Sequence, residues 1–390
     1  MTAAPPRWRR TRRVLGVVFV LGSVFVALVL SQSWRAMGKS AEGARRERME
    51  RSPQWHDGHF ENPQVIVNDI WGMLAAMRHT SADGSPHVAL PVVKIDPKSL
   101  RTPPASGLRV TWMGHSTTLI EIDGLRVLTD PSWSERSSPL TWAGPAHWYL
   151  PPIGLAELPH IDAVLISHDH YDHLDYATLV AMKDWDTRFV VPLGIGAHLA
   201  YWGIPEQNIA ELDWWQSTRV GALEIVCAPS RHASGRLFKQ NMTLWASYAL
   251  RGPAHRAYFS GDTGLFPGMA EIGARLGPFD VTLIEVGQYH RTWPDWHLGP
   301  EQAVRAHRML RGELLFPIHW GSLNLAFHGW TEPIERVLAA AATQRVRVVA
   351  PKPGQPVEPA QPPEVVRWWP DLPWETAAQS PVISSQVPLE

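Results

Sequence analysis

The nonapeptide SHDHYDHLD at residues 167–175 decides the fold, and it directly follows the apolar run VLI at 164–166. We expect a buried strand to deliver this polar segment to a loop at the edge of a sheet. On extended chain, His168 and His170 point the same way, while Asp172 and His173 turn into a following helix and face a neighbouring point. The pattern predicts two adjacent metal ions, because imidazole and carboxylate are ligands that zinc and iron prefer.

The remaining ligands must come from distant loops. Three candidates each close an expected strand: His232 after LEIVCAPSR, Asp262 in FSGDTG and His319 in PIHWG. An isolated histidine is usually a hydrogen-bonded core or surface residue. Four ligand residues within six positions, at a strand–loop–helix junction, instead favour a metal centre.

The surrounding sequence predicts strands and helices that alternate. TTLIEI at 117–122 and LRVLT at 125–129 flank Asp123-Gly124, which is a strong hairpin signal. We expect further strands at 161–167, 188–191, 223–227, 243–250, 256–260, 281–286 and 314–318, and helices at 175–183, 268–276 and 300–311. This order predicts an α/β fold in which two sheets are covered by helices on the outside.

These motifs resemble the metallo-β-lactamase-fold hydrolases. Within that fold, the chain is most similar to the N-acylphosphatidylethanolamine-hydrolysing phospholipase D group and its bacterial relatives. The resemblance rests on these segments: VTWMGHSTTLIEIDGLRVLTDP at 110–131, LPHIDAVLISHDHYDHLDY at 158–176, VPLG at 191–194, ELDWW at 211–215, FSGDTG at 259–264, GPFD at 277–280 and PIHWG at 317–321. It implies an αββα metallo-β-lactamase sandwich with a dinuclear site at one edge.

The resemblance also implies roles for individual residues. It assigns His168, His170 and His232 to one ion, Asp172, His173 and His319 to the other, and Asp262 to both. His297, before a Pro-Glu helix start, is expected to face the substrate, and His115 in MGHST to lie close to the metals. The expected ions are two Zn²⁺, with other divalent metals as alternatives.

The first functional hypothesis is a phosphodiesterase of the phospholipase D type that acts on N-acylphosphatidylethanolamine-like lipids. Two divalent ions lower the pKa of a bridging water to about 7 and so supply hydroxide at neutral pH. Asp262 would orient this hydroxide or accept its proton. Two alternatives remain: a lactonase or β-lactamase-type hydrolase, which uses the same hydroxide on a carbonyl carbon, and a non-enzymatic, membrane-tethered metal-binding protein.

The N-terminus carries an uncharged apolar run at 14–30 that follows five arginines within residues 7–13. This pattern is typical of a membrane anchor or a signal, and the lack of a small-residue cleavage pattern after the run favours a retained anchor. A twin-arginine export signal at 11–15 is a further interpretation. We divide the chain into an anchor or signal at 1–34, a linker and wrapping arm at 35–105, the hydrolase domain at 106–350 and a proline-rich tail at 351–390 that runs over the surface.

Composition limits the partners. Lysine and arginine number 36 against 37 aspartates and glutamates, so no basic field favours nucleic acid. The single cysteine, Cys227, excludes an intrachain disulfide and a cysteine-based zinc finger. Twenty tryptophans, many in expected loops, suit a lipid–water boundary. We therefore expect a lipid or small-molecule ester substrate and an anchor in a bacterial inner membrane, with the catalytic domain on the periplasmic side.

Overall fold

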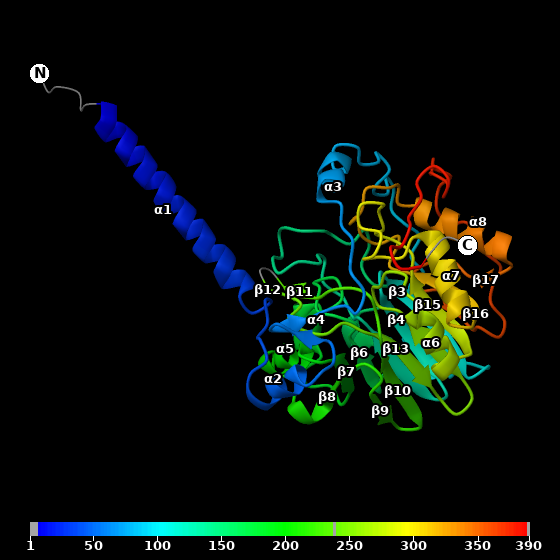
Figure 1. The fold of residues 1–390 in the computed structure, drawn as a ribbon. Coiled ribbons are helices and arrows are strands. Elements are labelled where there is room, and N and C mark those ends of the chain that lie inside the picture. Colours follow the sequence, from blue (N-terminus) through cyan, green and yellow to red (C-terminus); the bar gives the residue numbers. More distant parts are fainter. Residues whose placement is uncertain (1–6, 237–238, 388–390) are drawn as a thin grey trace, which may run out of the picture.

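The computed structural model describes residues 7–236 and 239–387, which contain two seven-stranded sheets packed face to face (Figure 1). The first sheet has the order β18-β3-β4-β5-β6-β7-β8, with bounds β3 (Leu108–Gly114), β4 (Thr117–Ile122), β5 (Leu125–Thr129), β6 (Ala163–Leu165), β7 (Arg188–Pro192), β8 (Ile209–Leu212) and β18 (Pro356–Val357). The second has the order β17-β16-β15-β14-β13-β10-β9, with bounds β9 (Ser217–Val220), β10 (Leu223–Ala228), β13 (Ser247–Arg251), β14 (Arg256–Phe259), β15 (Phe279–Glu285), β16 (Gly312–Ile318) and β17 (Arg347–Val348).

Helices cover the outer face of each sheet. Alternate residues of the first sheet, such as Leu119 and Val164, pack outward in one core with Leu179 and Leu199 of the helices α4 (Tyr176–Ala181) and α5 (Ile195–Tyr201). The residues between them, such as Ile120, belong to the core shared with the second sheet. The helices α6 (Gly268–Leu276), α7 (Pro300–Met309) and α8 (Glu332–Gln344) lie along the second sheet. The predicted αββα sandwich is therefore confirmed.

The predicted hairpin is formed by β4 and β5. Ile122 pairs with Leu125, so Asp123 and Gly124 are the two loop residues. Both have positive φ values, 49° and 85°, as a type I′ turn requires.

Parallel strands bring several loops to one edge of the molecule. In the first sheet β5, β6, β7 and β8 are parallel, and in the second β14, β15, β16 and β17 are parallel. The carboxyl ends of parallel strands meet at the same edge of a sheet, where α/β proteins place their ligands.

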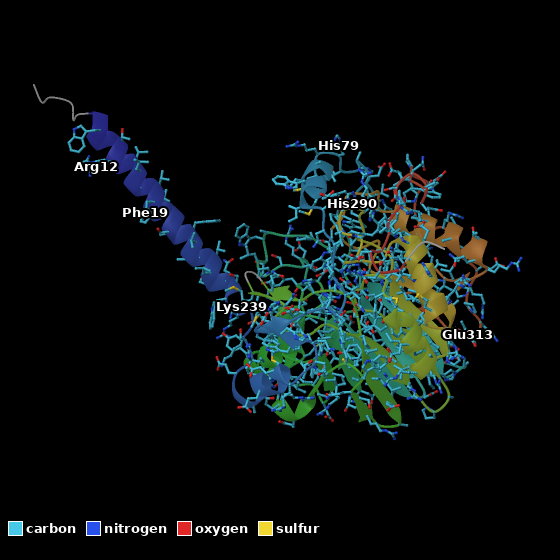
Figure 2. The ribbon with its side chains drawn as sticks, in the orientation of Figure 1. Arg12, Phe19, His79, Lys239, His290 and Glu313 are labelled. Carbon is cyan, nitrogen blue, oxygen red and sulfur yellow. The ribbon has the colours of Figure 1, made fainter. Side chains whose placement is uncertain are left out.

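The N-terminal part lies outside the two sheets. Helix α1 (Arg7–Ser33) projects from the body, and Phe19 on it stands clear of other side chains (Figures 1 and 2). The 23 residues from Thr11 to Ser33 include an 18-residue stretch with a mean hydropathy of 2.8 in which no residue is buried, so this helix is long and apolar enough to cross a membrane. The following arm contains α2 (Gly43–Glu50), the short strands β1 (Trp55–His56) and β2 (His59–Phe60), α3 (Ile70–Ala76) and the 3-10 turn η1 (Ser99–Arg101). A second short hairpin pairs β11 (Gly235–Arg236) with β12 (Lys239–Gln240).

The proline content of the C-terminal tail predicted a segment that runs over the surface. The structure shows that parts of the tail also pair with a strand and are buried. Strand β18 pairs with β3 at the edge of the first sheet. Trp369 is buried, with its ring centroid 5.4 Å from that of Trp320, and Ser385 donates to the buried carboxylate of Asp295 (2.7 Å). The tail is therefore bound to the body through Trp369 and Ser385, which its proline content did not predict.

Candidate metal centre

The seven predicted ligand residues meet at the edge where the strands end. His168, His170, Asp172 and His173 lie in the loop between β6 and α4. His232 follows β10, Asp262 follows β14 and His319 directly follows β16. All seven fall into overlapping groups in which the possible ligand atoms lie within 4.8 Å of one another.

The first cluster contains three histidines. Nε2 of His168 lies 2.8 Å from Nδ1 of His170, which lies 3.4 Å from Nε2 of His232. If neither of two ring nitrogens at such a distance carried a proton, their lone pairs would repel each other. A proton or a cation between them removes this repulsion. The cluster therefore has the chemistry of a cation site.

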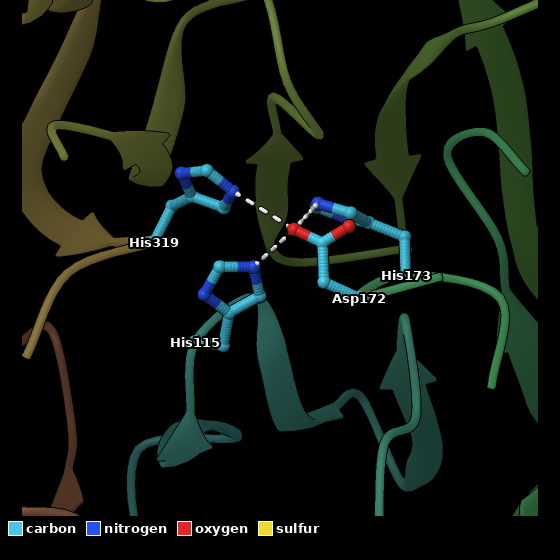
Figure 3. Close-up of side chains that lie close together, drawn as sticks. All are labelled: His115, Asp172, His173 and His319. Carbon is cyan, nitrogen blue, oxygen red and sulfur yellow. Dashed lines mark hydrogen bonds and ion pairs between the residues drawn. The ribbon is translucent and has the colours of Figure 1, made fainter. Parts of the chain in front are cut away.

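The second cluster surrounds the carboxylate of Asp172 (Figure 3). Its Oδ2 lies 2.9 Å from Nε2 of His115, 3.4 Å from Nε2 of His173 and 3.8 Å from Nε2 of His319. These side chains come from three separate loops, after β3, β6 and β16. The fold thus assembles a second possible ligand set beside the first.

Asp262 lies between the two clusters. One of its oxygens is 3.2 Å from Nε2 of His173, and the other is 3.2 Å from Nε2 of His319. The oxygen near His173 is also 3.7 Å from Nε2 of His232 and 3.9 Å from Nε2 of His168. This is the position that a ligand shared by two ions would occupy.

Asp130 and Ser167 orient two of the histidines, and sequence reasoning missed both. Nδ1 of His173 donates to Asp130 (2.7 Å), and the Ser167 hydroxyl also donates to Asp130 (2.6 Å). Nδ1 of His168 lies 2.9 Å from the Ser167 hydroxyl. These contacts leave both Nε2 atoms free to bind a cation, as outer carboxylates do in metal sites. Asp130 follows the expected strand 125–129, but its role depends on the pairing of β5 with β6, which the sequence does not show.

Glu285, at the end of β15, is a third missed residue. Its carboxylate accepts from Nδ1 of His297 (2.7 Å) and from the backbone N–H of Thr263 (2.6 Å). Nδ1 of His319 lies 3.4 Å away. Glu285 is completely buried, so it acts through these partners rather than by contact with a substrate.

The structure places the two other predicted site histidines differently. His297 is partly exposed and lines the cavity above the cluster. His115 is buried behind Asp172 and does not line that cavity. Its Nε2 belongs to the second cluster, 2.9 Å from Asp172, and its backbone carbonyl accepts from the N–H of His319 (2.9 Å).

Unpaired atoms show that the cluster fits a cation. Nε2 of His173, both ring nitrogens of His319 and Oδ1 of Asp262 are buried without a hydrogen-bond partner. Buried polar atoms of this kind are costly unless something binds them. Imidazole nitrogens together with carboxylate oxygens suit zinc or iron.

The pKa values in the cluster depend on burial and on its charges. Burial alone would lower the pKa of His319, but Asp262, Asp172 and Glu285 outweigh it and raise the value to about 10. Burial would likewise raise the pKa of Asp262, but His173 and His319 hold it well below its usual value. A bound cation would replace the histidine protons as partner of these carboxylates.

A cavity of about 530 Å³ opens above the cluster. Its floor includes His170, Asp172, His232, Asp262, His297 and His319, and its walls include Ile70, Met73, Trp293, Trp296 and Leu325. A polar floor under apolar walls is suited to a ligand with a polar head and an apolar body. A larger cavity of about 800 Å³ lies beside it and contains none of the predicted ligands.

Comparison with known proteins agrees with this geometry. Residues 125–320 match the model of the beta-lactamase superfamily domain. The chain belongs to this superfamily. It is 45% identical to an uncharacterized protein of Mycobacterium tuberculosis over 375 aligned residues, and the alignment covers 93% of this chain and 99% of that protein. It is 34% identical over 290 residues to the N-acyl-phosphatidylethanolamine-hydrolyzing phospholipase D 1 of Caenorhabditis elegans, over 67% of this chain and 80% of that one.

Solved structures share the fold of this superfamily. The metallo hydrolase Igni18 of Ignicoccus hospitalis superimposes with a TM-score of 0.51 at 23% identity, over 64% of this chain and 97% of that one. The isothiocyanate hydrolase of Delia radicum gut bacteria gives a TM-score of 0.51 at 18% identity, over 64% of this chain and 98% of that one. The protein is a metal-dependent hydrolase of the metallo-β-lactamase fold.

Proposed function

We propose that this hydrolase is a phosphodiesterase of the phospholipase D type that acts on N-acylphosphatidylethanolamine-like lipids. The observation that carries the proposal is the apolar cavity over the histidine–aspartate cluster, because a diacylated phosphodiester has an apolar body and an anionic head. The 34% identical relative from Caenorhabditis elegans supports the same substrate class.

The proposed centre holds two Zn²⁺ ions. His168, His170 and His232 would hold one ion, Asp172, His173 and His319 the other, and Asp262 both. When bound, such ions activate water and neutralise charge on phosphoryl oxygens. The chain's own contribution is to orient His173 and His168 through hydrogen bonds to Asp130 and Ser167, and His297 through its hydrogen bond to Glu285.

Two residues act directly on the substrate in this proposal. Asp262 accepts a hydrogen bond from the attacking water, and its low pKa favours orienting that water over storing its proton. His297, fixed by Glu285, faces the phosphoryl group or the leaving group from the cavity wall. Attack of water at phosphorus forms one P–O bond and breaks the P–O bond to the N-acylethanolamine oxygen, which takes up the proton that the water loses, so the products are an N-acylethanolamine and phosphatidic acid.

Helix α1 is proposed as a retained membrane anchor, with the domain on the periplasmic side. The guanidinium of Arg236 donates to the carbonyl of Ala36 just after α1 (2.6 and 3.0 Å), and the indole of Trp142 donates to Gln32 within α1 (2.9 Å). Because the body holds both points, the end of the helix is part of the folded structure.

The test is an assay of the purified full-length protein on three substrates: N-acylphosphatidylethanolamine, a lactone and a β-lactam. We expect turnover of the phospholipid, with N-acylethanolamine and phosphatidic acid as products, and loss of that turnover in Asp262→Asn. Turnover of the lactone or β-lactam alone would instead make the protein a carbonyl hydrolase. No turnover of any of them by metal-loaded protein would favour a binding function.

A further inference from the structure

Helix α3 lacks a partner. Among the described residues, none of the seven in α3 is buried, although the helix reads IWGMLAA. Trp71 is 82% exposed, and Val65, Ile70, Leu74 and Met77 around it are also exposed. Scattered exposed apolar residues are ordinary, but a contiguous patch of them marks an interaction site. We call these five residues the α3 surface.

The α3 surface is almost uncharged. Residues 65–77 contain a single charged side chain, Asp69, and its carboxylate accepts from the N–H of Gly72 at the start of the helix (2.8 Å). The backbone N–H of Asp69 donates to the carbonyl of Thr292 (2.8 Å), which fixes the helix to the body. The α3 surface is therefore fixed to the body, and few charged side chains near it would favour its contact with water.

One helix forms both this surface and the wall of the metal cavity. Ile70 and Met73 line the cavity, whereas Trp71 and Leu74 do not line it and are exposed to solvent; Ile70, 61% exposed, belongs to both surfaces. Residues three apart lie on the same side of a helix. Whatever covers the outer side of α3 therefore lies at the mouth of the cavity.

The position of α1 indicates what covers α3. The ring of Trp142 lies 6.2 Å from that of Phe25 and its indole donates to Gln32, so this loop of the body is beside the apolar part of α1. In Figure 1, α1 leaves the body toward the upper left, and α3 stands at the top of the same body. A bilayer that contains α1 would extend along this side of the molecule.

We propose that the α3 surface lies in the headgroup layer of the bilayer that holds α1, so that the metal cavity opens directly to the membrane. This inference rests on the proposed function, because it explains how a lipid reaches the cavity without passing through water. Tryptophan favours that layer because its ring is apolar and its N–H is polar. A helix that lies in this layer buries its apolar face about 5–10 Å into the boundary between headgroups and acyl chains.

The position of α3 can be measured without any substrate. The full-length protein is placed in phosphatidylcholine nanodiscs with a spin label at Trp71→Cys, Trp142→Cys or, as the control, Glu313→Cys. The native Cys227 is fully buried and does not compete for the label. Glu313 is exposed and lies away from α1 in Figure 2. We expect labels at 71 and 142 to collide with oxygen more than with a water-soluble nickel complex, and the label at 313 to show the reverse.

A label at 71 with the same accessibility as the label at 313 would overturn the inference. Strong dipolar broadening between labels at 71, with low accessibility to both reagents, would also overturn it, because the surface would then pair two copies of the chain. Neither result depends on catalysis, so the position of α3 is decided even where the proposed substrate fails.

A second measurement links the surface to substrate entry. We expect Trp71→Asp combined with Leu74→Asp to lower turnover of a bilayer-embedded phosphodiester lipid at least about tenfold, a free-energy change of about 1.4 kcal/mol. Turnover of a water-soluble, short-chain analogue should stay within about twofold of wild type, since the cavity wall residues Ile70 and Met73 are unchanged. Equal losses on both substrates would show that α3 supports the site rather than the membrane contact.

Discussion

At the scale of single residues, Asp130 is the contact that we expect to matter most outside the ligand set. It accepts from both His173 and Ser167 and is completely buried. We predict that Asp130→Asn lowers metal affinity about 10–100-fold, because the amide can no longer accept both protons and orient the ring. Competition with a chromophoric chelator measures this affinity. The exposed Asp184→Asn is the control and should bind as wild type does; equal affinity in both variants would refute the role of Asp130.

Protonation of His173 and His319 leads to a second prediction. The surrounding carboxylates raise the pKa of His319 to about 10 and that of His173 well above its usual value, so both rings carry a proton at pH 7 without metal. Metal binding must displace these protons. We therefore expect proton release on binding, and an apparent affinity that rises with pH toward about 10. Calorimetry in buffers of different ionisation enthalpy measures the release; heats that do not depend on the buffer would contradict it.

At the scale of elements, most of the sandwich could be predicted from the sequence. The hairpin at Asp123-Gly124 and the helix at 268–276 have the expected bounds, because turn residues and apolar periodicity are local signals. The strand expected at 243–250 instead begins at Ser247, because the backbone N–H groups of Leu244 and Ala246 donate to the carbonyls of Leu193 and Ser167 and not to a strand of the second sheet. Helix α8 was missed although Pro333 lies in its first turn.

In the candidate site too, residues marked by local sequence signals could be predicted, and residues that depend on strand order could not. The ligands in the 167–175 segment could be found because they are close in sequence. Asp130 and Glu285 could not, because each is a single carboxylate whose role depends on which strands become neighbours. Strand order is a long-range property that local patterns do not contain.

The C-terminal tail provides a prediction at this scale. The indole of Trp369 donates to Glu335 of α8 (2.7 Å), and its buried ring packs against Trp320. We expect Trp369→Ala to lower the free energy of unfolding by about 3–5 kcal/mol, since it leaves a cavity beside Trp320 and leaves Arg367 as the remaining donor to that oxygen of Glu335. Denaturant unfolding followed by circular dichroism measures this loss. Val366→Ala, 70% exposed in the same tail, should change little, and similar stability of the two variants would show that the tail is dispensable.

At the scale of the whole molecule, one apolar helix, a cavity with apolar walls and a buried histidine–aspartate cluster lie in one chain of nearly zero net charge. The two sheets meet at the edge where their strands end, and loops from each sheet contribute side chains to both clusters. Asp262, between the clusters, follows a strand of the second sheet. The proposed hydrolysis of a membrane lipid would use the helix, the cavity and the cluster together, whereas hydrolysis of a soluble ester would use only the cavity and the cluster.

A dinuclear centre is tested most directly by the number of metal ions that the folded chain holds. Elemental analysis of the purified full-length protein, after dialysis to remove loosely bound metal, measures this number. We predict two ions per chain in the wild type. A stoichiometry of one ion or none in correctly folded, metal-supplied protein would contradict a centre shared by His168, His170, Asp172, His173, His232, Asp262 and His319.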